Sequence, residues 1–398
     1  MKPVLYKLSG IRAPLTGIGR YSLELIRSSS KQERKLLAFK QGKLLEGQHL
    51  LQELANLESV SLPTHNTDKL NSRKLRSIVG NIPFSRQFYR ALDNLRFEKA
   101  TASLRDRSVI YHDLNYSLNQ ALTSTTKSSV STVYDLSNIV CPQTHPRHRV
   151  DYLNSYLEKL SKTDAQIITI SNAVKSDLIE HYSIESDRIS VTHLAADKQF
   201  RPRSEIECTE VLDAHSLYYK KYVLCVATLE PRKNLLSVIN AYEGLDPHLQ
   251  NEYPLAMVGP FGWKSAPLEK KLAKLNEAGV IRHLGFVSQL DLPTLYSGAS
   301  AFLYPSLYEG FGLPLLEAMK SGCACITSNE GALAEISSNS AIEVNALEHD
   351  DIGHHLNRLL QDPKINSYHV SLGLERAKSF SWRQTASKTA DVYDRLSS

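Results

Sequence analysis

Short apolar runs alternate with amphipathic, helix-period segments along the whole chain. This alternation is typical of parallel strands joined by crossover helices. In the first half the runs predict strands at residues 4–8, 35–39, 109–112, 131–134, 167–170 and 189–193. In the second half they predict strands at residues 222–227, 255–258, 281–284, 301–304, 324–328 and 341–344. Each half therefore has enough strands for its own Rossmann-like, doubly wound parallel sheet, and the predicted fold class is α/β.

A chain of 398 residues is long for a single core and suggests two domains. We place an N-terminal Rossmann-like domain at residues 1–197 and a C-terminal Rossmann-like domain at residues 204–380. Between them, residues 193–203 provide a plausible link. Residues 381–398 are predicted to form a capped amphipathic helix.

Composition indicates the class of protein and its cellular compartment. Apolar residues make up 42% of the chain, which is typical of a globular protein, and the five cysteines contain no Cys-x-x-Cys pair, which indicates a reducing compartment. The apolar run at residues 4–8 is too short for a signal peptide, and no stretch is long enough to cross a bilayer. We therefore expect a soluble, cytoplasmic protein.

The most informative stretch runs from Glu309 to Glu317 and reads Glu-Gly-Phe-Gly-Leu-Pro-Leu-Leu-Glu. Gly310 and Gly312 allow a tight turn and close approach to a ligand, and Pro314 suits the start of a helix, whose free N–H groups favour an anion. The two glutamates should lie at different depths of one pocket. One carboxylate could reach a sugar and the other a ribose.

Together with Tyr304-Pro305-Ser306 before it and Ala318-Met319 after it, this stretch resembles the donor-site motif of the retaining family 4 glycosyltransferases, particularly bacterial mannosyltransferases. The resemblance implies the GT-B arrangement, in which two Rossmann-like domains face a cleft, with the acceptor in the N-terminal domain and the nucleotide sugar in the C-terminal one. It also implies that the helix at 381–398 crosses back to the N-terminal domain. Donor-site contacts then fall to Glu309, Gly310, Phe311, Gly312, Leu313 and Glu317.

A second motif follows the strand predicted at 222–227 and reads Glu230-Pro231-Arg232-Lys233-Asn234. It resembles the phosphate-binding loop of the same family. Two cations at a helix start would stabilise a departing nucleotide diphosphate more than the bound substrate, and no metal or other cofactor is then required. A solvated Arg-Lys pair is the alternative.

Two further segments match donor-site positions of the family less specifically. Gly17 and Gly19 lie in Thr16-Gly17-Ile18-Gly19-Arg20-Tyr21, which lacks the third glycine of a dinucleotide fingerprint. The other candidates are Gly259, Phe286 and Val287, which match nucleobase-lining positions. An ordinary turn and ordinary core packing are the alternatives.

On the acceptor side, the family's His-Asp pair corresponds here to Tyr134-Asp135. Tyrosine is a poor base at neutral pH, although its hydroxyl can position an oxygen, so Asp135 is the better candidate to contact or deprotonate the incoming hydroxyl. His112, one strand earlier, could supply imidazole chemistry or be a core histidine. Glu309, Asp135, Arg232, Lys233 and His112 are thus the candidate catalytic residues.

The predicted function is transfer of a sugar, most plausibly mannose from GDP-mannose, to a glycan or a polyprenyl-diphosphate-linked acceptor with retention of configuration. A front-face mechanism, in which the leaving phosphate helps to deprotonate the acceptor, is favoured over a covalent intermediate. The rival enzyme functions are a sugar-nucleotide epimerase or a phosphorylase on the same fold. A non-catalytic homologue that senses sugar nucleotides is a further alternative.

Charge is concentrated in residues 69–107, which carry ten Lys or Arg against three acidic residues, while the whole chain has a net charge of +5. A cationic amphipathic segment could hold the protein on the anionic inner face of the cytoplasmic membrane, near a lipid-linked acceptor. A solvated basic face is equally consistent with the pattern. A nucleic-acid-binding protein is the rival from another class, but no recognised nucleic-acid module accompanies the charge, so no nucleic-acid partner is expected.

Overall fold

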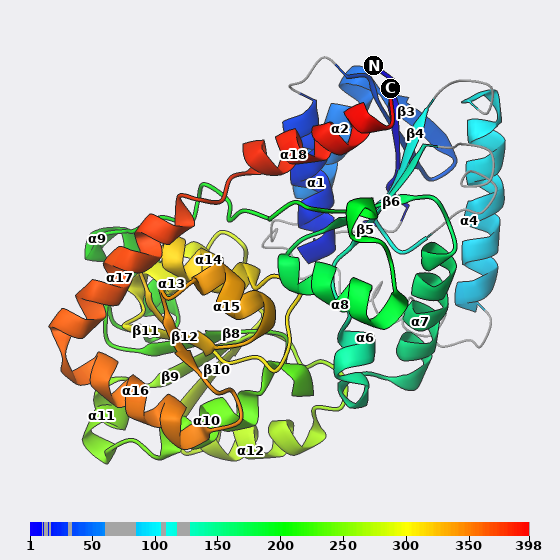
Figure 1. Cartoon of the computed structure of the whole chain (residues 1–398). Coiled ribbons are helices and arrows are strands. Elements are labelled where there is room, and N and C mark those ends of the chain that lie inside the picture. The colour runs from blue at the N-terminus through cyan, green and yellow to red at the C-terminus, as the bar shows by residue number, and fades with distance from the viewer. Residues whose placement is uncertain are drawn as a thin grey trace.

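The computed structural model describes residues 1–9, 11, 15, 17–30, 34–59, 85–104, 109–117 and 128–397. Within them the chain folds into two α/β halves, each built around one β-sheet (Figure 1). All twelve predicted strands are present. Residues 85–104 of the basic segment at 69–107 are described, as a helix and a short 3-10 turn, whereas residues 69–84 and 105–107 lie outside the described residues.

The first sheet has the strand order β3-β2-β1-β4-β5-β6-β7. Its strands are β1 (Val4–Lys7), β2 (Leu36–Lys40), β3 (Lys43–Glu46), β4 (Ile110–Asp113), β5 (Ser129–Val133), β6 (Gln166–Thr169) and β7 (Ile189–Val191). The helices of this half are α1 (Gly17–Ser29), α2 (Gly47–Ser59), α4 (Ser85–Thr101), α6 (Ser137–Val140), α7 (Arg147–Ser161) and α8 (Asn172–Tyr182), with short 3-10 turns at Ala102–Leu104, Pro142–Thr144 and Ser186–Arg188.

The β3 strand was not predicted from the sequence. It pairs antiparallel with β2 through a two-residue turn at Gln41 and Gly42, both of which have positive φ angles. Its side chains are mostly exposed, so it lacks the buried apolar run that marks the other strands. The remaining pairs of this sheet are parallel.

The second sheet is parallel throughout, with the order β10-β9-β8-β11-β12-β13. Its strands are β8 (Val223–Val226), β9 (Leu255–Val258), β10 (Ile281–Gly285), β11 (Ala301–Tyr304), β12 (Ala324–Ser328) and β13 (Ile342–Val344). Its helices are α9 (Glu205–Ala214), α10 (Leu235–Glu243), α11 (Pro247–Glu252), α12 (Ala266–Glu277), α13 (Leu292–Gly298), α14 (Leu313–Lys320), α15 (Gly331–Ser337), α16 (His349–Gln361) and α17 (Pro363–Ala377), with a 3-10 turn at Pro231–Lys233.

In each sheet the chain reverses its direction of strand addition once, between β1 and β4 in the first sheet and between β8 and β11 in the second. Open α/β sheets bind ligands at the carboxyl ends of the strands beside such a switch point. The loops after β8 and β11 are the segments that carry the Arg232-Lys233 and Glu309 motifs. The topology therefore brings the two motifs to one edge of the second sheet.

The last helix, α18 (Trp382–Arg395), returns to the first half and packs against α1, so that the two chain ends lie close together (Figure 1). Tyr393 on α18 is fully buried, and its hydroxyl lies 3.1 Å from that of Tyr6 and 2.6 Å from Nδ1 of His112. These contacts fix α18 on the first sheet.

Candidate functional site

Glu309 lies at the centre of a buried cluster of charges. Its Oε2 accepts a 2.9 Å hydrogen bond from Arg232, and its Oε1 accepts from Lys233 and, at 2.9 Å, from the hydroxyl of Tyr304. Arg232 also donates to Glu230 at 2.8 Å. Two carboxylates and two cations thus balance each other within the cluster.

Burial and the neighbouring charges shift the pKa values of the residues in this cluster. Burial alone would raise the pKa of Glu309, but Arg232 and Lys233 lower it to about 2. Burial, followed by the charge of Arg232, lowers the pKa of Lys233. For Arg232 burial acts to lower the pKa, but Glu309, Asp135 and Glu230 raise it overall. The carboxylate of Glu309 is therefore ionised at neutral pH and holds both cations in place.

Three N–H groups of the cluster remain for a ligand, namely Nε and one N–H of Nη2 on Arg232, and one N–H of Lys233. Nε of Arg232 is buried and has no hydrogen-bond partner among the described residues. Lys233 uses two of its three N–H groups, on Glu309 and on Tyr304 at 2.9 Å. The neighbouring Asn234 precedes α10, but its side chain does not cap that helix and donates instead to the carbonyls of Pro305 and Ala346.

In the structure the glycine turn allows close packing against other parts of the protein. A Cβ on Gly310 would lie 1.8 Å from the carbonyl oxygen of Tyr134, so its missing side chain permits close approach of the other half of the protein. Gly312 has a φ angle of 97° and would clash with Leu333. Of the next candidates, Phe311 is buried with its ring 5.9 Å from that of Phe380, and its side chain faces the core.

Glu317 lies in α14, with Leu313 and Pro314 forming the first turn of that helix. Its carboxylate accepts from the hydroxyl of Tyr296 at 3.2 Å and lies 3.7 Å from Arg20 of α1. Burial raises its pKa to about 7, against the opposing effect of Arg20. Arg20 also donates to Gln289, so it joins the first half to two segments of the second.

Asp135, the acceptor-side candidate, follows β5. Its Oδ1 accepts from the backbone N–H of Ser137 at 3.2 Å and from the Ser137 hydroxyl at 2.7 Å. Its charge contributes to the raised pKa of Arg232, which places it beside the cluster around Glu309. The Tyr134 hydroxyl, by contrast, donates to the carbonyl of Leu114 inside the core, so it does not take the sugar-positioning role considered for it.

His112 is placed in the core and not in the cleft. It is fully buried, its Nδ1 lies 2.6 Å from the hydroxyl of Tyr393 and its Nε2 lies 2.8 Å from that of Thr132. Burial lowers its pKa to about 3. The alternative of a core histidine therefore describes this residue, because both ring nitrogens are occupied away from the site.

The nucleobase candidates lie together beyond β9 and β10. Gly259 has a φ angle of 139°, and its N–H donates to the carbonyl of Gly285 at 2.7 Å. Phe286 is 59% exposed, whereas Val287 is buried. Gly17 and Gly19 lie in the first turn of α1, where a Cβ on Gly17 would meet no atom within 4 Å.

The two halves are in direct contact around the site. The hydroxyl of Tyr308 donates to Asp177 at 2.6 Å and accepts from the backbone of Leu136 at 3.1 Å. Glu335 on α15 accepts from the backbone N–H groups of Asn172 and Ala173, each at 3.0 Å, at the start of α8. The structure is therefore a closed arrangement of the two sheets.

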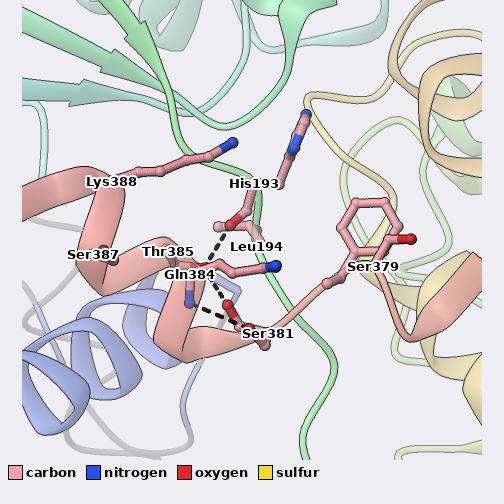
Figure 2. A pocket seen from close by; sticks show the side chains of 9 residues that line it. His193, Leu194, Ser379, Ser381, Gln384, Thr385, Ser387 and Lys388 are labelled. Carbon is pink, nitrogen blue, oxygen red and sulfur yellow. Dashed lines mark hydrogen bonds between the residues drawn. The ribbon is translucent and has the colours of Figure 1, made fainter.

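A hollow of about 310 Å³ lies where the chain crosses between the halves (Figure 2). The hydroxyl of Thr385 donates to the carbonyl of His193 at 2.6 Å and so ties one crossing segment to the other. The hollow is lined by His193, Leu194, Ser379, Phe380, Ser381, Gln384, Thr385, Ser387 and Lys388. None of these residues belongs to the cluster around Glu309.

Several site residues were not singled out from the sequence. Tyr304 and Arg20 stand inside the recognised motifs, so their position was a usable signal. Tyr308 had no such signal, because its partners Asp177 and Leu136 lie far away in the sequence. Ser137 lies two residues after Asp135, so this short spacing was a usable local signal. Among the described residues there is no cluster of His, Cys, Asp or Glu that could hold a metal ion, and no helix long and apolar enough to span a bilayer.

Comparison with known proteins agrees with this geometry. The model of the family described as "Glycosyl transferases group 1" matches residues 215–371. The chain is 33% identical to O-antigen chain mannosyltransferase B of Escherichia coli over 99% of its own length and 100% of that protein. It is 29% identical to the serotype-specific mannosyltransferase WbdA of Escherichia coli, over 77% of this chain and 40% of that protein.

Solved structures share the fold at low sequence identity. HepE from Anabaena, solved with UDP and glucose, has a TM-score of 0.72 and 15% identity, with 99% of this chain and 100% of that chain covered. WaaG, described as a glycosyltransferase involved in lipopolysaccharide biosynthesis, has a TM-score of 0.69 and 14% identity, with 98% and 99% covered. The two sheets thus have the GT-B arrangement of glycosyltransferases.

Proposed function

The chain belongs to the group 1 glycosyl transferases, and we propose that it transfers mannose from a nucleotide sugar, GDP-mannose being the proposed donor, to a growing surface glycan. The observation that carries the proposal is the cluster of Glu309, Arg232 and Lys233 at the switch point of the second sheet, facing Asp135 across the interface. The full-length similarity to an O-antigen chain mannosyltransferase supports the choice of sugar.

In the proposed ground state the donor diphosphate lies against Arg232 and Lys233. The buried Nε of Arg232 and the third N–H of Lys233 are free to receive phosphate oxygens. Because Glu309 fixes the position of both cations before the donor binds, they need little reorganisation when charge develops on the leaving group. Glu309 would also accept a hydrogen bond from a hydroxyl of the sugar, and Glu317 would accept one from a hydroxyl of the ribose.

The proposed chemistry retains the anomeric configuration. The bond between the anomeric carbon and the phosphate oxygen breaks, and the acceptor oxygen bonds to the same face. The acceptor proton passes to the departing phosphate, while Asp135 contacts the acceptor hydroxyl and orients it. The positive charge of Arg232 and Lys233 favours departure, so the proposal needs no metal ion.

The acceptor is proposed to be a glycan, either free or linked to polyprenyl diphosphate. Membrane contact through residues 69–107, of which the structure describes residues 85–104, is part of this proposal. Co-sedimentation with vesicles of increasing anionic lipid content tests it, and binding that does not respond to anionic lipid would exclude it.

A panel of nucleotide sugars tested by thermal shift, followed by transfer assays, tests the function. We expect GDP-mannose to raise the melting temperature most and mannose transfer to require a glycan acceptor. Conversion of the donor without any acceptor would indicate an epimerase, and dependence on inorganic phosphate a phosphorylase. Nucleotide binding without turnover under all conditions would indicate a sensing protein.

A further inference from the structure

Three side chains, those of His145, Ser137 and Asp135, form a hydrogen-bonded series that ends at the acceptor-side carboxylate. The Ser137 hydroxyl donates to Oδ1 of Asp135 at 2.7 Å, and Nε2 of His145 lies 2.9 Å from the same hydroxyl. Ser137 and His145 are 1% and 3% exposed. These buried residues support a carboxylate that is only partly buried, so they lie behind Asp135 as seen from the cleft.

The hydrogen-bond inventory fixes the tautomer of His145. The Ser137 hydroxyl has one proton, and a carboxylate only accepts, so that proton is directed to Asp135. Nε2 of His145 must therefore donate to the Ser137 oxygen. Burial, together with the charges of Arg149 and Arg232, lowers the pKa of His145 to about 4, so the ring is neutral near pH 7 and its single proton resides on Nε2.

The same arrangement leaves one oxygen of Asp135 available. Both hydrogen bonds from Ser137 go to Oδ1, and no described residue donates to Oδ2. A carboxylate held at one oxygen by a buried chain presents the other in a fixed direction. Fixed orientation of a reacting group by a second and third side chain is a common device of active sites.

The position of the histidine ring is itself constrained. It packs on Trp263 of the other half, with the ring centroids 5.5 Å apart. Trp263 donates from its indole to the carbonyl of Thr144 at 2.7 Å, and the Arg149 guanidinium lies over the Trp263 ring, 5.1 Å from its centroid. Contact between the two halves therefore helps to hold His145, which donates the first hydrogen bond of the series.

We propose that His145 is a positioning residue for glycosyl transfer: through Ser137 it holds the Asp135 carboxylate so that Oδ2 meets the incoming acceptor hydroxyl. The proposal rests on the transferase function given above. It assigns no proton transfer to His145, because the ring nitrogen facing Ser137 remains protonated throughout.

Kinetics of paired variants test the proposal. In His145→Gln the side-chain amide can still donate to Ser137, and we expect kcat within about threefold of wild type. In His145→Leu the donor is lost, and we expect kcat to fall about tenfold with KM for the donor unchanged, as for loss of one hydrogen bond. Equal losses in both variants, or a change confined to KM, would overturn the proposal in favour of a packing role.

A double variant tests whether the residues act as one unit. Asp135→Asn alone should lower kcat about 100-fold or more, and His145→Leu in that background should lower it no further. Multiplicative losses, or full activity of Asp135→Asn, would contradict the proposal. His148→Leu, which removes an exposed histidine of α7, is the control, and it should not reproduce the kcat loss of His145→Leu.

A measurement independent of turnover separates failure of this inference from failure of the function. Long-range proton–nitrogen NMR on protein labelled at histidine should show the His145 proton on Nε2 at pH 7, and this preference should weaken in Ser137→Ala. A proton on Nδ1 would overturn the proposal even in an active enzyme. Lack of any glycosyl transfer by the wild type would refute the proposed function, whatever the tautomer.

Discussion

The guanidinium of Arg232 donates a 2.9 Å hydrogen bond to the carboxylate of Glu309, although the two residues lie 77 positions apart in the chain. The parallel β8–β11 pairing places the loops that follow these strands next to each other, and the backbone of Leu307 donates to the carbonyl of Arg232 at 2.9 Å. The donor-site motif and the phosphate-loop motif are therefore one structural unit.

Glu309→Gln should destabilise the ligand-free protein and enhance its response to nucleotide. Removing one partner from a buried group of charges leaves the others uncompensated, at a cost of about 3 kcal/mol in the free energy of unfolding. A nucleoside diphosphate would restore the negative charge, so its thermal shift should exceed that of the wild type. Differential scanning fluorimetry with and without GDP measures both effects.

The control for that variant is Glu207→Gln, which removes an exposed ion pair with Arg201. We expect little change in melting temperature and an unaltered nucleotide response. A smaller nucleotide shift in Glu309→Gln than in the wild type would show that Arg232 and Lys233 do not receive the diphosphate.

Gly310→Ala should prevent the two halves from reaching the closed arrangement. Its methyl group would lie 1.8 Å from the carbonyl oxygen of Tyr134, and backbone on both sides leaves no flexible atom to give way. A displacement of about 1 Å at a reacting centre costs roughly 100-fold in rate, so kcat should fall by at least that factor. Small-angle scattering should show a larger radius of gyration.

Gly244→Ala is the matched control, because the nearest atom that a Cβ there would meet, the carbonyl oxygen of Ala241, lies 3.5 Å away and the residue has an ordinary φ of −76°. It should retain wild-type activity and dimensions. Wild-type kcat in Gly310→Ala would show that the contact with Tyr134 is absent from the reacting enzyme.

Tyr308→Phe should lower kcat about tenfold with little effect on nucleotide affinity. The lost hydroxyl bridges Asp177 and the backbone of Leu136, the residue after Asp135, whereas the Tyr308 carbonyl that accepts from Arg232 is retained. One unsatisfied buried N–H corresponds to about 1–3 kcal/mol. Steady-state kinetics and GDP titration measure the two quantities, with the exposed Tyr218→Phe as control. Weakened GDP binding with unchanged kcat would contradict the positioning role of this hydroxyl.

Glu317→Gln should change how stability depends on pH. Burial raises the pKa of Glu317 to about 7 from an ordinary value of 4.5. Between these values the folded protein binds more protons than the unfolded chain, so this group makes stability fall as pH rises through the window. The loss builds up between about pH 4.5 and pH 7, reaches about 3 kcal/mol at higher pH and should be absent from the variant.

Melting temperatures of both proteins at pH 5 and pH 8, measured without ligand, test this. The wild type should lose more stability between the two values than Glu317→Gln. An equal loss in both would show that Glu317 is ionised in the folded protein well below pH 7, in a fully formed pair with Arg20.

The sequence by itself determined the two-sheet architecture and the location of the donor motifs. Apolar periodicity and turn residues are local signals. They predicted every described strand except the exposed β3. The glycine turn at 310–312 and the cations at 232–233 could likewise be located from short motifs, because such motifs are defined by residue types at fixed spacing. Their contact with phosphate stays a prediction.

The tertiary structure decided which of those residues meet. It buried His112 against Tyr393, directed the Tyr134 hydroxyl into the core and turned the Phe311 ring toward Phe380, so none of these side chains faces the cleft. It also joined Tyr308 to Leu136, which lies 172 positions away. Such pairings depend on how the two sheets and their loops pack together, and packing between segments far apart in the chain leaves no periodic signal along it.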